Sequence, residues 1–150
     1  MPVSNAILLA SDHGAIDLRA ALRDHVTARG LEAIDLGTDD TASVDYPDFA
    51  ATLAQAIQEG RAERGLLLCG TGVGISIAIN RYPFIRGALV HDVTGARLCR
   101  QHNDANVLVL GGRTTGVEVA RDCVDAFLDT AFEGGRHARR VHKLGAMPAL

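Results

Sequence analysis

Five short segments that are expected to be strands, each followed by a segment of helical periodicity, limit the fold of this chain more than any other feature of its sequence. They lie near residues 6–10, 31–36, 66–68, 86–90 and 107–110. The apolar run at 66–68 is too short for a helix and is typical of a strand buried on both faces of a sheet. Helices are expected at 15–29, 47–59, 75–81, 93–102 and 116–128, with a last short helix at 136–144. This alternation predicts an α/β fold, a doubly wound sandwich in which helices cover both faces of a five-stranded parallel sheet.

The chain has the length of one domain with a basic tail. Its 150 residues can bury a core of their own, and neither a linker nor a repeat divides them, so we treat 1–150 as a single domain and 133–150 as its tail. From Arg136 onward the tail carries four Lys or Arg and no acid, whereas the whole chain has a formal net charge of −3. This balance argues against general nucleic-acid binding and favours a specific anion or an acidic partner surface.

The cysteines and the first residues of the sequence predict the cellular compartment. Cys69, Cys99 and Cys123 are an odd number without paired zinc spacing, which is typical of free thiols in a reducing compartment. No apolar run approaches the length of a membrane span, and the first residues have neither the charged nor the apolar region of a signal peptide. We therefore expect a cytoplasmic protein without a membrane partner.

A glycine-rich turn follows the central apolar run. Cys69 comes directly after Leu68, glycines stand at 70, 72 and 74, and an apolar helical segment begins near Ile75. Glycines let a backbone approach a ligand and aim N–H groups at it, so a strand, this turn and a helix together predict an anion site. A thiol near a helix N-terminus can become a thiolate. The plainer interpretation is that Cys69 only packs in the core, as most buried cysteines do.

Two well-known phosphate motifs do not fit this turn. A Walker A loop ends in Gly-Lys-Ser/Thr, but here Gly74 is followed by Ile75 and Ser76. A dinucleotide fingerprint needs a third glycine at position 75. A nucleotide-binding module is therefore only a weak alternative.

Titratable and polar residues follow several of the predicted strands. In an open parallel sheet, ligands bind beyond the carboxyl ends of the strands. At those ends the sequence has Asp12-His13, Cys69 with its glycines, His91-Asp92 and Arg113. Their convergence on one edge of the sheet predicts a site there.

Further polar residues close the helices near the C-terminus. Arg136 and Arg140 are four apart and would share a helix face, either as a phosphate clamp or, more simply, as part of a solvated terminal helix. Asn103 suits a helix C-cap, and His102 suits the negative end of the helix dipole.

Several blocks together resemble the type B ribose-5-phosphate isomerases, whose family also includes galactose-6-phosphate and allose-6-phosphate isomerases. The cysteine-glycine and Gln-His-Asn-Asp blocks are the most specific. The matching blocks are Ser-Asp-His-Gly at 11–14, Asp-Leu-Gly-Thr at 35–38, Asp-Tyr-Pro at 45–47, Cys-Gly-Thr-Gly-Val-Gly-Ile-Ser at 69–76, Arg-Gln-His-Asn-Asp-Ala-Asn-Val at 100–107 and Glu-Gly-Gly-Arg-His at 133–137.

The resemblance implies a Rossmann-like fold and a reversible aldose–ketose isomerisation, ribose 5-phosphate to ribulose 5-phosphate, with no metal and no cofactor. It implies catalytic roles for Cys69, His102 and Thr71. Cys69 would move a proton between C1 and C2, and His102 with Asn103 would help to open the furanose ring. Some relatives use a glutamate at the position of Ile75, so this chain has the cysteine form.

The resemblance also implies how the substrate is held. Asp12 and His13 would contact the sugar, and Tyr46 would line the pocket. The backbone from Gly70 to Gly74, Val73 included, would hold the enediolate oxygens. The phosphate would lie among Arg113, Arg136 and Arg140.

The family's sites form between two subunits, where His102 and its neighbours reach the partner's cysteine loop. The resemblance therefore implies a homodimer with shared active sites, or a tetramer built from it. Two alternatives remain open at this point. The same chemistry could act on a tetrose or hexose phosphate, or the chain could be a non-catalytic phosphate or nucleotide-binding module.

Overall fold

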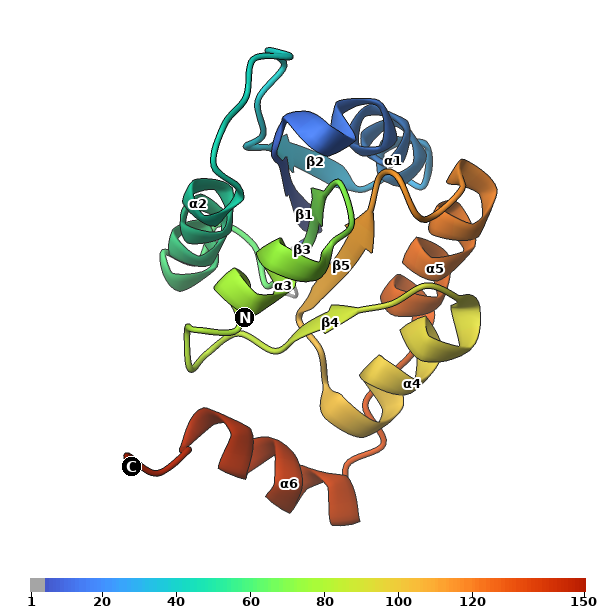
Figure 1. The fold of residues 1–150 in the computed structure, drawn as a ribbon. Helices are drawn as coiled ribbons and strands as arrows, with labels where there is room; N and C mark the ends of the chain where they lie inside the picture. Colours follow the sequence, from blue (N-terminus) through green and yellow to red (C-terminus); the bar gives the residue numbers. More distant parts are fainter. Residues whose placement is uncertain (1–4) are drawn as a thin grey trace.

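Five parallel strands form the centre of the computed structural model, which describes residues 5–150 (Figure 1). Their order across the sheet is β2-β1-β3-β5-β4. The central strand β3 pairs with β1 on one side and with β5 on the other. The strand bounds are Ala6–Ser11 for β1, Glu32–Asp35 for β2, Arg64–Cys69 for β3, Gly87–Leu89 for β4 and Val107–Gly111 for β5. The parallel five-stranded sheet predicted from the sequence is confirmed.

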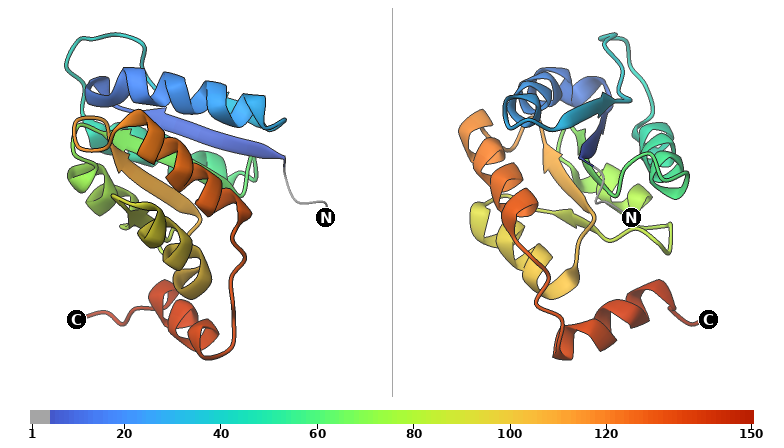
Figure 2. Two further views of the ribbon diagram at one scale, coloured as in Figure 1. Left: turned by 90° about the vertical axis from the view of Figure 1, so that its right-hand side faces the viewer. Right: turned by 180° about the vertical axis from the view of Figure 1, so that it is seen from behind.

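Helices cover both faces of this sheet, as Figure 2 shows. One face carries α1 (Ile16–Ala28), α4 (Val93–Asn103) and α5 (Val117–Asp129), and the other carries α2 (Tyr46–Gln58) and α3 (Val73–Ile79). Alternate residues of β3 point to opposite faces, so Leu66 and Leu68 join the first core and Leu67 and Cys69 join the second. The inner strands β1, β3 and β5 are buried on both faces and therefore carry apolar runs, whereas the edge strands β2 and β4 are only partly buried.

The ends of α4 differ from the sequence interpretation in one detail. Asn103 is still helical, and the C-cap is Asp104, which has a left-handed backbone with φ 48°. At the other end, Asp92 caps the helix, because its Oδ1 accepts a hydrogen bond from the N–H of Gly95 at 2.7 Å. Asp92 of the pair His91-Asp92 thus has a structural explanation in the cap.

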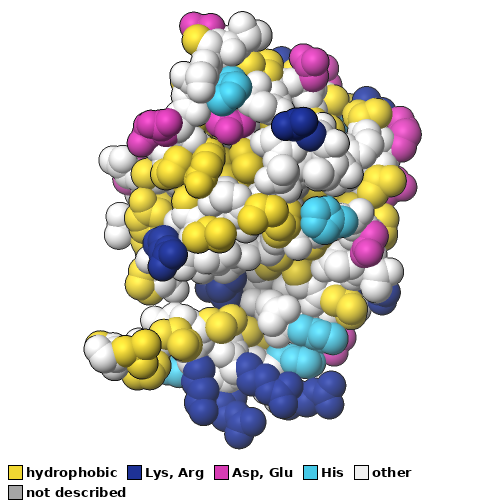
Figure 3. Space-filling model, in the orientation of Figure 1, with side chains coloured by type: hydrophobic (Ala, Val, Ile, Leu, Met, Phe, Trp, Pro, Cys, Tyr) yellow, Lys and Arg dark blue, Asp and Glu magenta, His cyan; other side chains and the backbone are white. Residues whose placement is uncertain are grey.

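The last helix, α6 (Arg136–Gly145), lies apart from the sheet and packs near the end of α4 (Figure 1). Gly134 and Gly135 have φ of 66° and 55°, a conformation that favours glycine and lets the chain turn back toward α4. The basic side chains of α6 face the solvent and form a dark blue band in Figure 3. Within residues 5–150, none of the helices combines the length and apolar character needed to cross a membrane.

A buried arginine fixes the long loop that joins β2 to α2. The side chain of Arg19 is 1% exposed and lies 3.0 Å from Asp35 and 2.7 Å from Asp39. It also donates to the hydroxyl of Ser11 and to the carbonyl of Thr38, both at 2.7 Å. One guanidinium therefore joins the end of β1, the end of β2 and the start of the loop.

Replacing Arg19 by methionine is expected to lower the free energy of unfolding by about 3 kcal/mol, because several polar groups lose a buried partner at once. Arg23 provides a matched control, since its side chain also bonds Asp35, at 2.9 Å, but is 41% exposed. Arg23→Met should cost about 0.5 kcal/mol. Urea unfolding at equal protein concentration measures both values. Equal losses in the two variants would contradict the role given to Arg19.

Candidate active site

The carboxyl ends of β1, β3 and β5 meet at one edge of the sheet, and Cys69 is the last residue of the middle one. Loops from both neighbouring strands close around it. After β1, Gly14 comes so near that a Cβ there would lie 3.0 Å from the nitrogen of Gly70. After β5, the N–H groups of Gly112 and Arg113 donate to the carbonyls of Cys69 and Gly70 at 2.9 and 2.8 Å. Three strand ends thus meet at one edge of the sheet, as expected from the sequence, and that they form a functional site stays a prediction.

Cys69 is 5% exposed, and its Sγ accepts a hydrogen bond from the N–H of Gly72 at 3.1 Å. This bond holds the sulfur against the glycine turn. The other two thiols have a different environment. Burial raises the pKa of both Cys99 and Cys123 to about 11, so neither can supply a thiolate at neutral pH. That Cys69 works as a thiolate stays a prediction.

The glycine turn is held very tightly at its middle residue. Gly72 has φ of 76°, and α3 begins at the next residue. A Cβ at this position would lie 2.6 Å from Leu89 Cδ1 and 3.0 Å from the carbonyl carbon of Leu110. Thr71 stabilises the turn, since its hydroxyl oxygen accepts a hydrogen bond from the N–H of Val73 at 3.2 Å.

Gly72→Ala is expected to destabilise the fold by about 2 kcal/mol, since alanine must adopt a left-handed backbone and also displace β5. Gly116→Ala is the matched control, because that glycine has φ of −68° and nothing within 4 Å of an added Cβ. Thermal unfolding of both variants checks the difference. A loss in Gly116→Ala as large as that in Gly72→Ala would show that the turn has no special constraint.

Asp12 and His13 are placed beside the turn by hydrogen bonds. Asp12 is 6% exposed, and its Oδ1 accepts from the N–H of Gly14 at 2.8 Å. The Nδ1 of His13 accepts from the N–H of Val44 at 3.1 Å, so the ring proton of neutral His13 is on Nε2. That bond ties the β2–α2 loop to the site.

Tyr46 and Arg113 lie on either side of the same turn. Tyr46 begins α2, and its ring is so close to Gly74 that a Cβ there would lie 2.5 Å from the ring carbon Cζ. The side chain of Arg113 lies equally close to Gly70, because a Cβ added to Gly70 would lie 3.3 Å from Arg113 Cδ. Arg113 makes no ion pair among residues 5–150, which leaves its guanidinium free for an anion.

The remaining predicted residues lie elsewhere in the chain. The helix α4 starts after the carboxyl end of β4 and runs back to the amino end of β5, so His102 and Asn103 lie at the opposite edge of the sheet from Cys69 (Figure 1). Arg136 and Arg140 belong to α6, which packs against this end of α4. One chain therefore presents two groups. We call the group around Cys69 the cysteine half-site and the group around His102 the histidine half-site.

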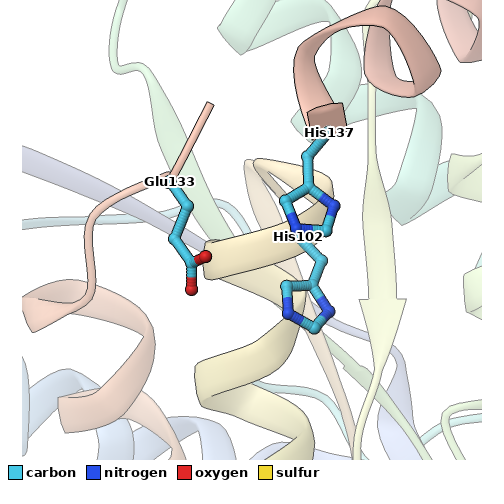
Figure 4. Close-up of side chains that lie close together, drawn as sticks. All are labelled: His102, Glu133 and His137. Atoms are coloured by element: carbon cyan, nitrogen blue, oxygen red, sulfur yellow. The ribbon is translucent and has the colours of Figure 1, made fainter. Parts of the chain in front are cut away.

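The histidine half-site contains a residue to which the sequence interpretation gave no role. The ring of His137 stacks on that of His102 with centroids 4.4 Å apart and planes 14° from parallel (Figure 4). Burial, followed by the charges of His102 and Arg136, lowers the pKa of His137. The sequence did not predict this buried position, because His137 lies at the start of a basic helix and a run of charged residues usually faces solvent.

Comparison with known proteins places these residues in a family. Residues 7–144 match the model of the Ribose/Galactose Isomerase family. The chain is 43% identical to the ribose-5-phosphate isomerase B of Escherichia coli, with 94% of this chain and 95% of that protein covered. It is also 43% identical to a D-erythrulose-4-phosphate isomerase of Pectobacterium atrosepticum, with 93% of each covered.

Solved structures agree with the sequence relatives. The ribose-5-phosphate isomerase B of Clostridium thermocellum superposes with a TM-score of 0.92 at 48% identity, covering 95% of this chain and 96% of that one. The match extends over both half-sites, since it includes nearly the whole chain. On this evidence, the chain belongs to the Ribose/Galactose Isomerase family.

Proposed function

We propose that this protein interconverts D-ribose 5-phosphate and D-ribulose 5-phosphate as an aldose–ketose isomerase. The observation that carries the proposal is the cysteine half-site. A thiol stands at the end of the central strand and accepts a hydrogen bond from the N–H of Gly72 in a glycine turn, and Asp12 and His13 follow the neighbouring strand. The E. coli relative named for this activity supports the choice of sugar.

Cys69 is the proposed base. It takes the proton from C2, next to the carbonyl, and returns it to C1, while a second proton moves from the hydroxyl oxygen of C2 to the carbonyl oxygen of C1, so the substrate is isomerised without gaining or losing atoms. Between the two steps an enediolate carries negative charge. Backbone N–H groups between Gly70 and Gly74 are the proposed donors to it, and one such donor contributes about 3 kcal/mol in other enzymes. Thr71 supports the turn that carries them.

Arginines from both half-sites are proposed to hold the phosphate. Arg113 lies next to the glycine turn, and Arg136 and Arg140 are one turn apart on α6. A phosphate held far from the reacting carbons orients the sugar chain toward Cys69. Tyr46 is proposed to line the pocket between the phosphate and Cys69.

A second copy of the chain is proposed to complete each site. The cysteine half-site of one chain and the histidine half-site of the same chain lie at opposite edges of the sheet, so one copy cannot supply both to a small sugar. Bringing the two half-sites together requires a homodimer with two shared sites, and a tetramer built from two such dimers is the alternative. Three free thiols fit the reducing cytoplasm as the place of action.

Exposed apolar side chains support an association surface between copies. Tyr46, Val73 and Ile77 are 40%, 49% and 54% exposed, and Figure 3 shows hydrophobic side chains gathered over the face that α3 presents. On α6 and beyond it, Leu144 and Met147 line a groove of about 440 Å³ beside β4. A second copy would cover these surfaces, which otherwise expose apolar area to water.

Nuclear magnetic resonance of the protein with ribose 5-phosphate in D2O, with a chelator present, tests the reaction directly. Appearance of ribulose 5-phosphate with deuterium at the carbons that share the proton is expected. Absence of conversion, while the protein is folded, would refute the proposed reaction on this sugar. Absence of conversion with every sugar phosphate would favour a binding module instead.

A tetrose phosphate is the second candidate substrate, because a relative of equal identity is named D-erythrulose-4-phosphate isomerase. One carbon more or less in a pocket changes preference by only about 10- to 200-fold. Comparing kcat/KM for four-, five- and six-carbon aldose phosphates, allose and galactose 6-phosphates included, decides between them. A clear preference for ribose 5-phosphate would exclude the tetrose.

His102 is expected to act on the ring form of the substrate. In His102→Ala, turnover of ribose 5-phosphate should fall by about 10²-fold or more, since opening the furanose ring needs a proton donor or acceptor. Isomerisation of an aldose phosphate too short to close a furanose ring should be nearly unchanged. Steady-state kinetics on both substrates measures the difference, and equal losses on both would contradict ring opening by His102.

A further inference from the structure

The helix α6 packs on the body of the molecule through a histidine. Of its residues only His137 is buried, at 7% exposure, and the surface it meets is the ring of His102. Neither ring takes part in a hydrogen bond or ion pair with any of residues 5–150. Ring nitrogens without a protein partner are available to bind an ion or a small polar ligand. The pair of imidazoles therefore points to a ligand that both rings can bind.

A carboxylate lies beside the two rings. The N–H of Glu133 donates to the carbonyl of Gln101 at 3.1 Å, which fixes Glu133 next to the end of α4. Gly134 and Gly135 then turn the chain, and the N–H of His137 donates to the carbonyl of Gly134 at 3.0 Å. One ligand atom from each of Glu133, His102 and His137 lies within 4.8 Å of the others (Figure 4).

We propose that His102, Glu133 and His137 form a binding site for a divalent transition-metal ion, with Zn²⁺ as the representative. Two imidazoles and one carboxylate are a common set of zinc ligands, and a water molecule would take the fourth position. The same donors suit Co²⁺ and Ni²⁺. This site is separate from the proposed proton transfer, which uses the cysteine half-site.

Small side-chain movements would complete the geometry. Ligand atoms about 2.1 Å from a tetrahedral zinc ion lie about 3.4 Å apart, so the present separations must shrink by roughly 1.4 Å at most. The two rings are nearly parallel, so one of them must turn before a nitrogen of each can point at the same ion. Rotation of one ring about χ2, a soft torsion, turns its nitrogen toward the other. Glu133 is exposed and can follow.

Binding there would affect turnover through His102. An ion held by this ring removes it from the opening of the sugar ring, so Zn²⁺ should inhibit isomerisation of ribose 5-phosphate, and a chelator should restore it. This consequence rests on the proposed function, whereas metal binding itself does not. Arg136 and Arg140 are also on α6, and their positive charge should make binding weaker than at a closed structural zinc site.

Calorimetric titration of the full chain with Zn²⁺ near pH 7.5 tests the site without any activity assay. We expect one ion per chain in the wild type and an affinity at least 10-fold lower in both Glu133→Gln and His137→Gln. His142→Gln is the matched control, because His142 is an exposed histidine of the same helix. Circular dichroism of the metal-free variants establishes that each is folded. Equal affinity in all four proteins would overturn the proposal.

Two further readouts separate the possible failures. With Co²⁺ the absorption spectrum should show nitrogen and oxygen ligands, whereas a strong sulfur-to-metal band that is lost in Cys69→Ser would place the ion on the thiol and overturn the site. In assays of ribose 5-phosphate, Zn²⁺ should inhibit the wild type and His142→Gln but inhibit His137→Gln at least 10-fold less. Metal binding without any isomerase activity would refute the proposed function but support the metal site. Isomerase activity without metal binding would support the proposed function but refute the metal site.

Discussion

Replacing Cys69 by alanine is expected to lower kcat for ribose 5-phosphate by about 10²- to 10⁴-fold while KM changes little, because the proposed general base is lost and the proposed phosphate contacts remain. The structure places its Sγ under the N–H of Gly72 at the end of a central strand, where the proposed proton transfer occurs. Steady-state kinetics with a coupled assay for the ketose measures both constants.

Cys99→Ala is the matched control for this loss. Cys99 is equally buried, at 6% exposure against 5% for Cys69, but it lies in the core on the other face of the sheet. Burial raises the pKa of its thiol to about 11, so it has no thiolate to contribute. We expect near wild-type kcat in Cys99→Ala. If Cys69→Ala kept a tenth or more of wild-type kcat, another group would have to be the base.

Mixed dimers are expected to recover activity that each parent variant has lost. In a dimer of one Cys69→Ala chain and one His102→Ala chain, one shared site carries both changes and the other carries neither. Such dimers, purified through two different tags, should therefore show about half of the wild-type activity. The recovery follows from the position of the two half-sites at opposite edges of each chain.

A second mixture tests whether the recovery depends on this geometry. Cys69 and Arg113 belong to the same half-site, so a mixed dimer of Cys69→Ala and Arg113→Ala chains has one defect in each site and should remain nearly inactive. Mass measurement of the purified species shows that both chains are present. Equal recovery in the two mixtures, or none in either, would contradict sites shared between copies.

Much of the fold could be predicted from the sequence, because a parallel sheet covered on both faces needs unbroken apolar strands and amphipathic helices. The run at 66–68 is confirmed as part of β3, and α1 and α2 are followed by Gly30 and Gly60, whose φ values of 84° and 76° favour glycine. The strand order could not be predicted. That β5 lies between β3 and β4 depends on how the crossover helices pack, and no local pattern records it.

Part of the candidate site was also visible in the sequence. Residues at the carboxyl ends of parallel strands must meet at one edge, so Asp12, Cys69 and Arg113 were expected together, and the structure brings them together. Arg19 was not recognised, although it fixes the loop beside this edge. A single arginine on an amphipathic helix usually faces solvent, and only the packed structure shows it buried against two aspartates.

The sequence by itself determined the elements, the glycine turn and the chemical types of the residues near each strand end, because these depend on local periodicity and backbone freedom. Only the tertiary structure decided that His102 and Cys69 of one chain lie at opposite edges of the sheet, and that His137, rather than an apolar residue, attaches α6 to α4. Those relations join residues far apart in the chain, and they are set by which faces pack against each other. Local patterns carry no information about that packing.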